Sequence, residues 1–394
     1  MMKNLYLQNY YLNEIRIGYR SDKYFKRSKI ILENKNDLRK VKIQIFQREK
    51  SILCGIKESI EILKECVGFY SDKKKSIKLF KNYLRIKKSD KYKDLRCLQK
   101  DLFEVEKELD NIWVNTFNDI EIFSLNDGDI INPWETVMTI EGPLSYFVNL
   151  ETIYLGILSR RTKIATNVNK VVLAANKKPI LFFPARFDHF SLQEGDGYAA
   201  IIGGADSIST DAQGEWKNIE GVGTIPHAFI SAFNGNTVKA AELFNQNFPD
   251  IKLIVVVDYD NDSVKTSIDV AKRLGEKLWA VRIDTSSNMV DQSIISSMGN
   301  FIPTGVNQNL VMNVRDGLDK NGFKQVKIIV SGGFDFKKIK LFEKNNVPVD
   351  IYGVGSSILK HNIDFTADIV TLNGITSSKK GRKINKNSRL KLNN

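Results

Sequence analysis

The chain has 394 residues, of which 42% are hydrophobic, and it carries a formal net charge of +13 with a pI near 9.3. This length suffices for two or three domains with full cores. No apolar run approaches the roughly 20 residues that span a bilayer, and the first segment lacks the order of a signal peptide, so we expect a cytoplasmic protein without a membrane partner. The spacing of Cys54, Cys66 and Cys97 favours neither a disulfide framework nor a zinc site.

Much of the positive charge lies in two segments, residues 71–100 and the final stretch SSKKGRKINKNSRLKLNN. Clustered lysine and arginine residues can bind a phosphate backbone. Lysine dominates over arginine throughout, however, and this bias explains much of the charge without a partner. We therefore favour a solvated helical insertion at about 69–110 over nucleic-acid binding.

The first part of the chain, residues 1–143, is predicted to form an α+β domain around this insertion. Apolar and polar residues alternate over Lys40–Phe46, and GDIINPWETVMTIEG indicates two strands joined by a turn. From 144 to 176, apolar residues recur at helical spacing, which predicts a connection of two packed helices.

Six short apolar runs rich in β-branched residues then follow, and helical patterns lie between several of them. This alternation predicts a parallel sheet with crossover helices. Six strands in about 180 residues favour a compact, irregular α/β barrel over 177–365, and we expect the basic tail 366–394 to return to the N-terminal domain. The runs are KPILFFPAR, ADSISTD, KLIVVVDYD, LWAVRID, VKIIVSGG and VDIYGVG.

Each run ends in polar or glycine residues, and the carboxyl ends of parallel strands are where ligand sites assemble. Two glycine-rich turns, Ser331-Gly332-Gly333 and Gly353-Val354-Gly355-Ser356, can direct backbone N–H groups at one phosphate. Arg282 and Asp284, two apart on a strand, point the same way and suit a carboxylate and a sugar hydroxyl or Mg²⁺. A structural ion pair is the alternative for these two residues.

Two further features follow the same strands. The acidic segment DYDND, which contains Asp258, is interpreted mainly as the N-terminal cap of a helix. His227, in GTIPHAFI, lies just after a proline at the start of a short apolar helix, where the local pattern alone favours a buried structural histidine over a catalytic one.

Several strings, in this order, resemble nicotinate phosphoribosyltransferases: RSDKYFKRSKIIL, VKIQIFQREKSILCGI, TIEGPLSYFVNLETIYLGILSRRTKIATN, IGGADSIST, GTIPHAFI, VRIDTSS, VKIIVSGGFD, VDIYGVGSSI and GRKINKNSRL. The resemblance covers most of the chain apart from roughly 69–110. It implies a type II phosphoribosyltransferase fold, in which an N-terminal domain packs on an irregular α/β barrel. It also implies a homo-oligomer whose active sites are completed across a subunit interface.

The activity that the resemblance implies joins nicotinate to 5-phosphoribosyl 1-pyrophosphate with Mg²⁺, and ATP hydrolysis drives the reaction through a phosphohistidine. His227 occupies the position of that histidine, and Asp284 is expected to meet ribose hydroxyls or Mg²⁺, whose ligands are not assigned. Tyr24 would border the pyridine ring, Thr224 would contact nicotinate, and Arg282 would pair with its carboxylate. The remaining implied roles are the ribose 5′-phosphate for Ser331, Gly332, Gly333, Gly353, Gly355 and Ser356, and pyrophosphate for Arg160, Arg161, Lys163 and Arg186.

Two other functions remain open. A quinolinate phosphoribosyltransferase shares the fold, needs a second basic clamp for its extra carboxylate and needs no ATP. A polyanion-binding protein with an inactive barrel would owe its binding to residues 71–100.

Overall fold

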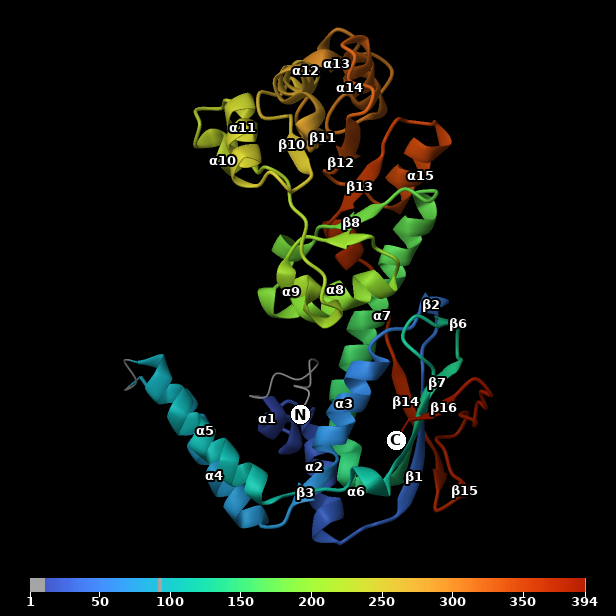
Figure 1. Cartoon of the computed structure of the whole chain (residues 1–394). Coiled ribbons are helices and arrows are strands. Elements are labelled where there is room, and N and C mark those ends of the chain that lie inside the picture. Colours follow the sequence, from blue (N-terminus) through green and yellow to red (C-terminus); the bar gives the residue numbers. More distant parts are fainter. Residues whose placement is uncertain (1–10, 91–93, 394) are drawn as a thin grey trace. The chain divides into compact units, whose positions relative to one another are not determined.

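The computed structural model describes residues 11–90 and 94–393, and the chain divides into two compact units (Figure 1). The first unit comprises Met1–Thr162 with Asn362–Asn394, and the second comprises Lys163–His361. The segment that we expected as a separate connection is therefore shared between the two units. Residues 91–93 of the predicted insertion lie outside the described residues.

The N-terminal unit is built on an antiparallel sheet of six strands in the order β15-β14-β1-β7-β5-β16. Its centre pairs β1 with β7, so that Ile43 lies opposite Ile140. The tail of the chain supplies three of the six strands, and β16 pairs with β5. The strands of this unit are β1 (Lys40–Phe46), β2 (Ser51–Ile52), β3 (Gly68–Tyr70), β4 (Trp113–Asn115), β5 (Glu121–Ser124), β6 (Ile130–Ile131), β7 (Thr136–Pro143), β14 (Thr366–Leu372), β15 (Ile375–Thr376) and β16 (Lys391–Asn393).

Helices pack against this sheet through one apolar core. Ile60 and Leu63 of α3 and Leu158 of α7 are buried in the same cluster as Ile45 of β1 and Ile140 of β7. The helices of the unit are α1 (Leu12–Arg16), α2 (Lys23–Asn34), α3 (Ile56–Cys66), α4 (Lys73–Lys87), α5 (Leu95–Asn111), α6 (Leu144–Phe147) and the first half of α7 (Glu151–Ala174).

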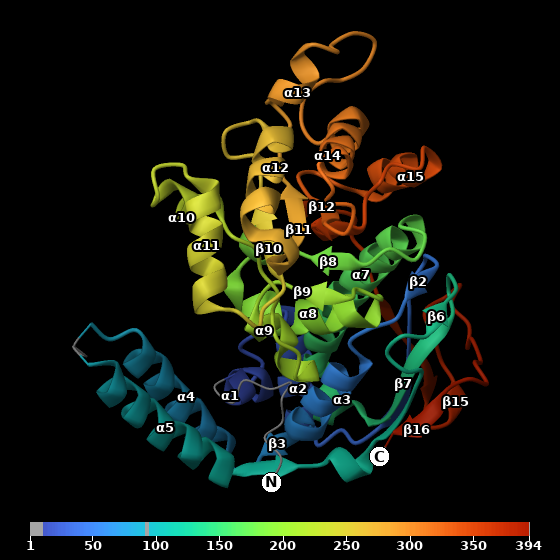
Figure 2. The ribbon, with the colours of Figure 1, turned by 45° about the horizontal axis from the view of Figure 1, so that its top comes forward.

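The predicted insertion forms a helical hairpin of α4 and α5, which lie side by side in Figures 1 and 2. Phe80 and Tyr83 of α4 pack with Val105 and Leu109 of α5 in a small core of their own. At its base, β3 pairs with β4 on either side of the hairpin.

The prediction of two packed helices over 144–176 is wrong. After the four residues of α6 and a short 3-10 turn, a single helix of 24 residues, α7, runs from Glu151 to Ala174. Its middle carries the polar stretch Ser159–Thr162, which breaks the apolar pattern but contains no proline or glycine to interrupt the backbone.

The second unit contains a six-stranded sheet, parallel throughout, in the order β10-β11-β12-β13-β8-β9. Every residue of β8, β10 and β13 is buried, as expected for strands covered on both faces. The predicted class, a parallel α/β unit with an N-terminal α+β unit, is confirmed. The strands are β8 (Ile180–Phe182), β9 (Ser207–Ile208), β10 (Leu253–Val256), β11 (Leu278–Ile283), β12 (Lys327–Val330) and β13 (Ile351–Val354).

Helices α12 and α14 pack against each other, and α12 also packs against α11. Five strands of the sheet each contribute one apolar residue to a common buried cluster, namely Leu181, Ile254, Ala280, Ile329 and Ile351. The helices are α8 (Gln193–Ile202), α9 (Asp211–Gly214), α10 (His227–Ser231), α11 (Thr237–Asn247), α12 (Ser263–Leu274), α13 (Gln292–Ile295), α14 (Gln308–Lys320) and α15 (Phe336–Lys344).

An irregular segment, residues 222–225, connects the two edges of this sheet. The Val222 N–H donates to the Ile208 carbonyl of β9 (2.8 Å), and the Ile225 N–H donates to the Ile254 carbonyl of β10 (3.2 Å). These two hydrogen bonds link the β9 edge of the sheet to its β10 edge through residues 222–225, so that the curved sheet partly closes into a barrel. In the described part of the chain, no helix combines the length and the apolar character that crossing a membrane would require.

Candidate active site

A cavity of about 440 Å³ opens where the parallel strands of the second unit end. Of the site residues predicted from the sequence, it is lined by His227, Asp284, Thr224, Arg282, Arg186, Ser331, Gly332, Gly333, Gly353, Gly355 and Ser356. The fold brings these residues together because parallel strands expose their carboxyl ends on one side of the sheet.

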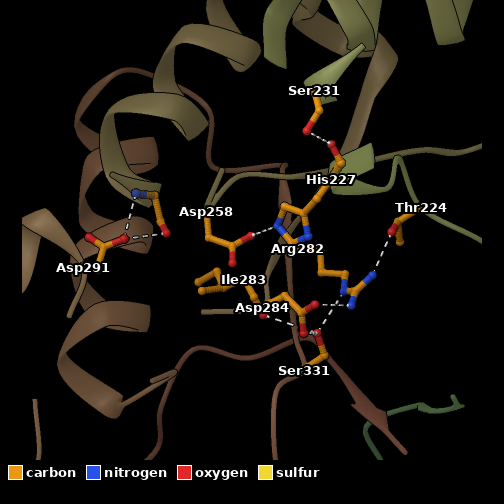
Figure 3. Close-up of polar contacts among 10 residues, drawn as sticks. Thr224, His227, Ser231, Asp258, Arg282, Ile283, Asp284, Asp291 and Ser331 are labelled. Atoms are coloured by element: carbon orange, nitrogen blue, oxygen red, sulfur yellow. Dashed lines mark hydrogen bonds and ion pairs between the residues drawn. The ribbon is translucent and has the colours of Figure 1, made fainter. Parts of the chain in front are cut away.

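The guanidinium of Arg282 is held in one orientation by three neighbours (Figure 3). Its Nε donates to Ser331 Oγ (2.8 Å), Nη1 donates to Thr224 Oγ1 (2.9 Å) and Nη2 donates to Asp284 Oδ2 (2.7 Å). Asp284 in turn accepts from the Ser331 hydroxyl through Oδ1 (2.6 Å). One N–H of each Nη remains for a ligand, since a guanidinium carries five donors.

His227 begins α10 and contacts a carboxylate at the end of β10. Its Nε2 lies 3.0 Å from Asp258 Oδ1, and the Asp258 side chain is only 7% exposed whereas that of His227 is 45% exposed. This hydrogen bond raises the pKa of His227 above its ordinary value, against the opposing effect of partial burial. Because a carboxylate only accepts, Nε2 carries the proton and Nδ1 of the neutral ring keeps its lone pair.

The sequence analysis did not identify Asp258 as the partner of His227. It interpreted DYDND as a cap, and Asp262 does cap α12 by accepting from the Lys265 N–H (3.2 Å). Asp258, the first aspartate of the segment, lies two residues after the end of β10, however. Arg282 and Asp284 likewise lie at the end of β11 and directly after it, and this common position at strand ends was the available signal.

Two glycine-rich turns, at Ser331–Gly333 and Gly353–Ser356, also line the cavity. Gly332 and Gly333 have φ values of 81° and 76°, a left-handed conformation that side chains other than hydrogen rarely adopt. At Gly355 a Cβ atom would lie 2.9 Å from the Phe187 ring and 3.0 Å from the Phe183 carbonyl oxygen. Backbone N–H groups in such turns can approach an anion closely.

Lys338 supports the first of these turns from the following helix, α15. Its Nζ lies 3.4 Å from the Gly332 carbonyl oxygen and 4.2 Å from the centre of the Phe334 ring. Burial lowers the pKa of Lys338 to about 8. The sequence analysis did not select this residue.

Two aromatic side chains, Phe183 and Phe187, also line the cavity and were not predicted. Phe183 follows β8, and the Arg282 guanidinium lies 5.6 Å from the centre of its ring. Arg186, between the two, lies 5.2 Å from the Phe187 ring. The stretch FFPAR after a strand end was the signal for these residues, and only its arginine was singled out.

The other predicted site residues do not line this cavity. Tyr24, on α2 of the N-terminal unit, is 61% exposed. Arg161 donates to both carboxylate oxygens of Glu58 (2.7 and 3.1 Å) in a buried ion pair of that unit, which departs from the predicted pyrophosphate role. Arg160 and Lys163 also lie on α7 and are partly buried.

Among the described residues, no group of three or more His, Cys, Asp or Glu side chains is arranged to hold a metal ion. Protein sites for Mg²⁺ often contribute only one or two carboxylates and leave the other positions to substrate phosphates and water. The carboxylate of Asp284, at the cavity wall, fits such a partial site.

Comparison with known sequences finds similarity to phosphoribosyltransferases. Residues 108–162 match the family model of the quinolinate phosphoribosyl transferase N-terminal domain. The chain is 26% identical over 246 residues to nicotinate phosphoribosyltransferase pncB2 of Mycobacterium tuberculosis, covering 61% of this chain and 48% of that protein. It is 24% identical over 238 residues to the nicotinate phosphoribosyltransferase of Bacillus subtilis, covering 60% and 45%. The chain thus spans about half the length of the curated relatives that it matches.

Solved structures extend the likeness to nearly the whole chain. The nicotinate-nucleotide pyrophosphorylase of Pyrococcus furiosus superposes with a TM-score of 0.72 at 30% identity, covering 97% of this chain and 82% of that one. Human nicotinic acid phosphoribosyltransferase superposes with a TM-score of 0.64 at 15% identity, covering 91% and 75%, and supports the fold alone. At 30% identity over nearly its whole length, the chain belongs to the same family as this Pyrococcus pyrophosphorylase; it resembles nicotinate phosphoribosyltransferases in sequence and has the type II phosphoribosyltransferase fold.

Proposed function

We propose that this protein is a nicotinate phosphoribosyltransferase of NAD salvage, which makes nicotinate mononucleotide and pyrophosphate from nicotinate and 5-phosphoribosyl 1-pyrophosphate. The observation that carries the proposal is that one cavity contains an arginine held in a fixed orientation, two glycine-rich turns and a histidine that is hydrogen-bonded to an aspartate. The arginine and the turns match parts of these two substrates, and the histidine matches the γ-phosphoryl group of ATP.

The carboxylate of nicotinate pairs with the two remaining N–H donors of Arg282, and Thr224 fixes the guanidinium plane. The pyridine ring lies against Phe183 or Phe187, whose faces border the same cavity. The turns at Ser331–Gly333 and Gly353–Ser356 hold the 5′-phosphate through backbone N–H groups.

Ribosyl transfer then needs little chemistry from the protein. The bond from the anomeric carbon to pyrophosphate breaks, the pyridine nitrogen forms the new bond, and the ribose carries positive charge in between. Positioning of the nitrogen and stabilisation of the departing anion are therefore the main contributions. Mg²⁺ would be held by Asp284 together with substrate oxygens, and it would neutralise charge on the pyrophosphate.

ATP coupling is proposed to proceed through His227. The Nδ1 lone pair attacks the γ-phosphorus of ATP, a P–N bond forms, the bond to the bridging oxygen breaks and ADP leaves. Water later takes the phosphoryl group to give inorganic phosphate. Asp258 supports this role because it holds the proton on Nε2 and leaves Nδ1 as the nucleophile.

A product assay tests the activity. Purified protein is incubated with the activated phosphoribose, Mg²⁺ and either nicotinate or quinolinate, and mononucleotide formation is followed by chromatography. We expect product from nicotinate. Product from quinolinate with release of CO₂, and none from nicotinate, would overturn the proposal.

Quinolinate phosphoribosyl transfer is the second candidate because one specific observation favours it. Arg186 lines the cavity together with Arg282, and two arginines suit a dicarboxylate better than a single carboxylate. The pairing of His227 with Asp258 favours nicotinate instead, since a decarboxylating reaction does not need a phosphoryl acceptor.

We also propose that active sites are shared between copies of this chain, with Tyr24 bordering the pyridine ring of another subunit. A complementation experiment tests this arrangement. Tyr24→Ala and His227→Ala variants are each assayed alone and after co-refolding into mixed oligomers. Recovery of ATP-stimulated activity in the mixture supports shared sites, and its absence with intact oligomers contradicts them.

A further inference from the structure

The hairpin helix α4 and its C-cap residue Lys88 together carry eight basic residues and no acidic residue. They do not all share one environment. Lys73 lies 3.6 Å from Glu33, Lys75 lies 3.6 Å from Glu108, and Lys87 lies 2.5 Å from Glu14. These three lysines are exposed as well, but each lies next to a carboxylate of the same unit.

The other five basic residues form what we call the basic stripe: Lys74, Lys78, Lys81, Arg85 and Lys88. All five are exposed, and none forms an ion pair with any residue in the described part of the chain. Their spacing of four, three, four and three residues places them on one face of the helix. At 1.5 Å per residue the stripe is about 21 Å long.

The stripe faces directly away from the hairpin core. Ser76, Phe80 and Tyr83, on the opposite side of α4, are buried against α5. Two acidic residues of α5 pair with cations outside the stripe, Glu108 with Lys75 and Asp110 with Arg16. The amphipathic period of α4 accounts for the alignment of these residues, but a solvated face does not require that all of its charges be positive.

We propose that the basic stripe is a sequence-independent binding surface for the phosphate backbone of a nucleic-acid duplex. Five aligned cations displace condensed counterions from a regular row of phosphates, and this release of counterions is the driving force. We assign its four lysines and one arginine to phosphate contacts, which fix the position of a protein on the duplex but carry no sequence information. This function is separate from the cavity of the second unit.

Two observations favour a duplex over other anions. An interfacial helix binds anionic membranes by inserting an apolar face beside its cations, but the apolar face of α4 is occupied by α5. Proteins that bind single strands without sequence preference stack bases on aromatic side chains. The described residues of the stripe face include none, because Phe80 and Tyr83 are buried.

The test uses the full-length protein and a fluorescein-labelled 20-base-pair DNA duplex of arbitrary sequence, with anisotropy measured between 50 and 200 mM salt. Five phosphate contacts predict a slope of log K against log salt of about −4.5, and hence a roughly 500-fold loss of affinity over this range. The triple variant Lys78→Gln, Lys81→Gln, Arg85→Gln retains two contacts and should give a slope of about −1.8.

The matched control removes the same charge elsewhere, with Lys239→Gln, Lys272→Gln and Lys320→Gln, three exposed lysines on helices of the second unit. It should keep the steep slope. Equal slopes for the two triple variants, or a wild-type slope shallower than about −1, would overturn the proposal. Binding to phosphatidylserine vesicles but not to the duplex would overturn the proposal in favour of a membrane. The same titration with an RNA duplex shows whether the stripe binds DNA or RNA more tightly.

Discussion

The orientation of Arg282 gives a prediction that separates a substrate-binding role from a structural one. Three neighbours hold its guanidinium, and two N–H donors remain for a ligand. If these donors bind the carboxylate of nicotinate, the pair contributes about 1.5–3 kcal/mol, because at least one partner is charged and the geometry is fixed. Nicotinamide has the same ring but no charge and serves as the reference ligand.

The perturbation is Arg282→Gln, and the assay is calorimetric titration with each ligand. The wild type should bind nicotinate more tightly than nicotinamide by about 10- to 150-fold, the factor that this energy gives. In Arg282→Gln this ratio should approach one. Arg282→Lys keeps the charge but loses the planar fork, so an intermediate ratio is expected.

The ratio is informative because a structural defect would weaken both ligands together. Arg282 also supports Asp284 and Ser331, so a general loss of affinity in the variants would not be surprising. The reasoning is refuted if Arg282→Gln lowers the affinity for nicotinate and for nicotinamide by the same factor.

Three further predictions concern other parts of the molecule. Asp258→Asn removes the charge that raises the pKa of His227, so the pH at which phosphoryl labelling from ATP begins should move to a lower value, as a pH–rate profile would show; an unmoved profile would exclude Asp258 as the cause. Gly355→Ala places a Cβ 2.9 Å from the Phe187 ring, so the KM for the activated phosphoribose should rise by at least about tenfold, in line with a loss of 1.4 kcal/mol, and an unchanged KM would argue against a phosphate at this turn. Lys29→Met leaves three carbonyl oxygens without their shared donor and should destabilise the N-terminal unit by about 1–3 kcal/mol in urea unfolding, whereas an unchanged midpoint would mean that water replaces the ammonium.

Much of the parallel unit could be predicted because its strands are buried at both faces and read as short apolar runs. The same runs end in the residues that line the cavity, so Arg282, Asp284 and the two glycine-rich turns followed from position alone. The role expected of His227 came from the family resemblance, since the local pattern alone favoured a structural histidine.

Other features depend on contacts that no short pattern contains. Asp258 meets His227 across 31 positions of the chain, and Arg161 meets Glu58 across 103. From the sequence alone, a charged residue whose partner lies so far along the chain cannot be distinguished from one that binds a substrate. The single helix α7 was missed for a different reason, because polar residues at its centre interrupt the apolar period but not the backbone.

The basic stripe shows the same limit. Counting lysines over 71–100 gave a charge but not its distribution. The ion pairs of α4 with residues of α1, α2 and α5 separate the three paired lysines from the five aligned cations.

The most direct test of the account compares mononucleotide formation by the wild type and by His227→Ala, each with and without ATP. Ribosyl transfer itself needs no nucleophile from the protein, so His227→Ala should retain the ATP-independent rate. Its stimulation by ATP should disappear, because the phosphoryl acceptor is gone. Full ATP stimulation in His227→Ala would contradict the role of the histidine, and no mononucleotide from nicotinate in either protein would contradict the assignment of the cavity.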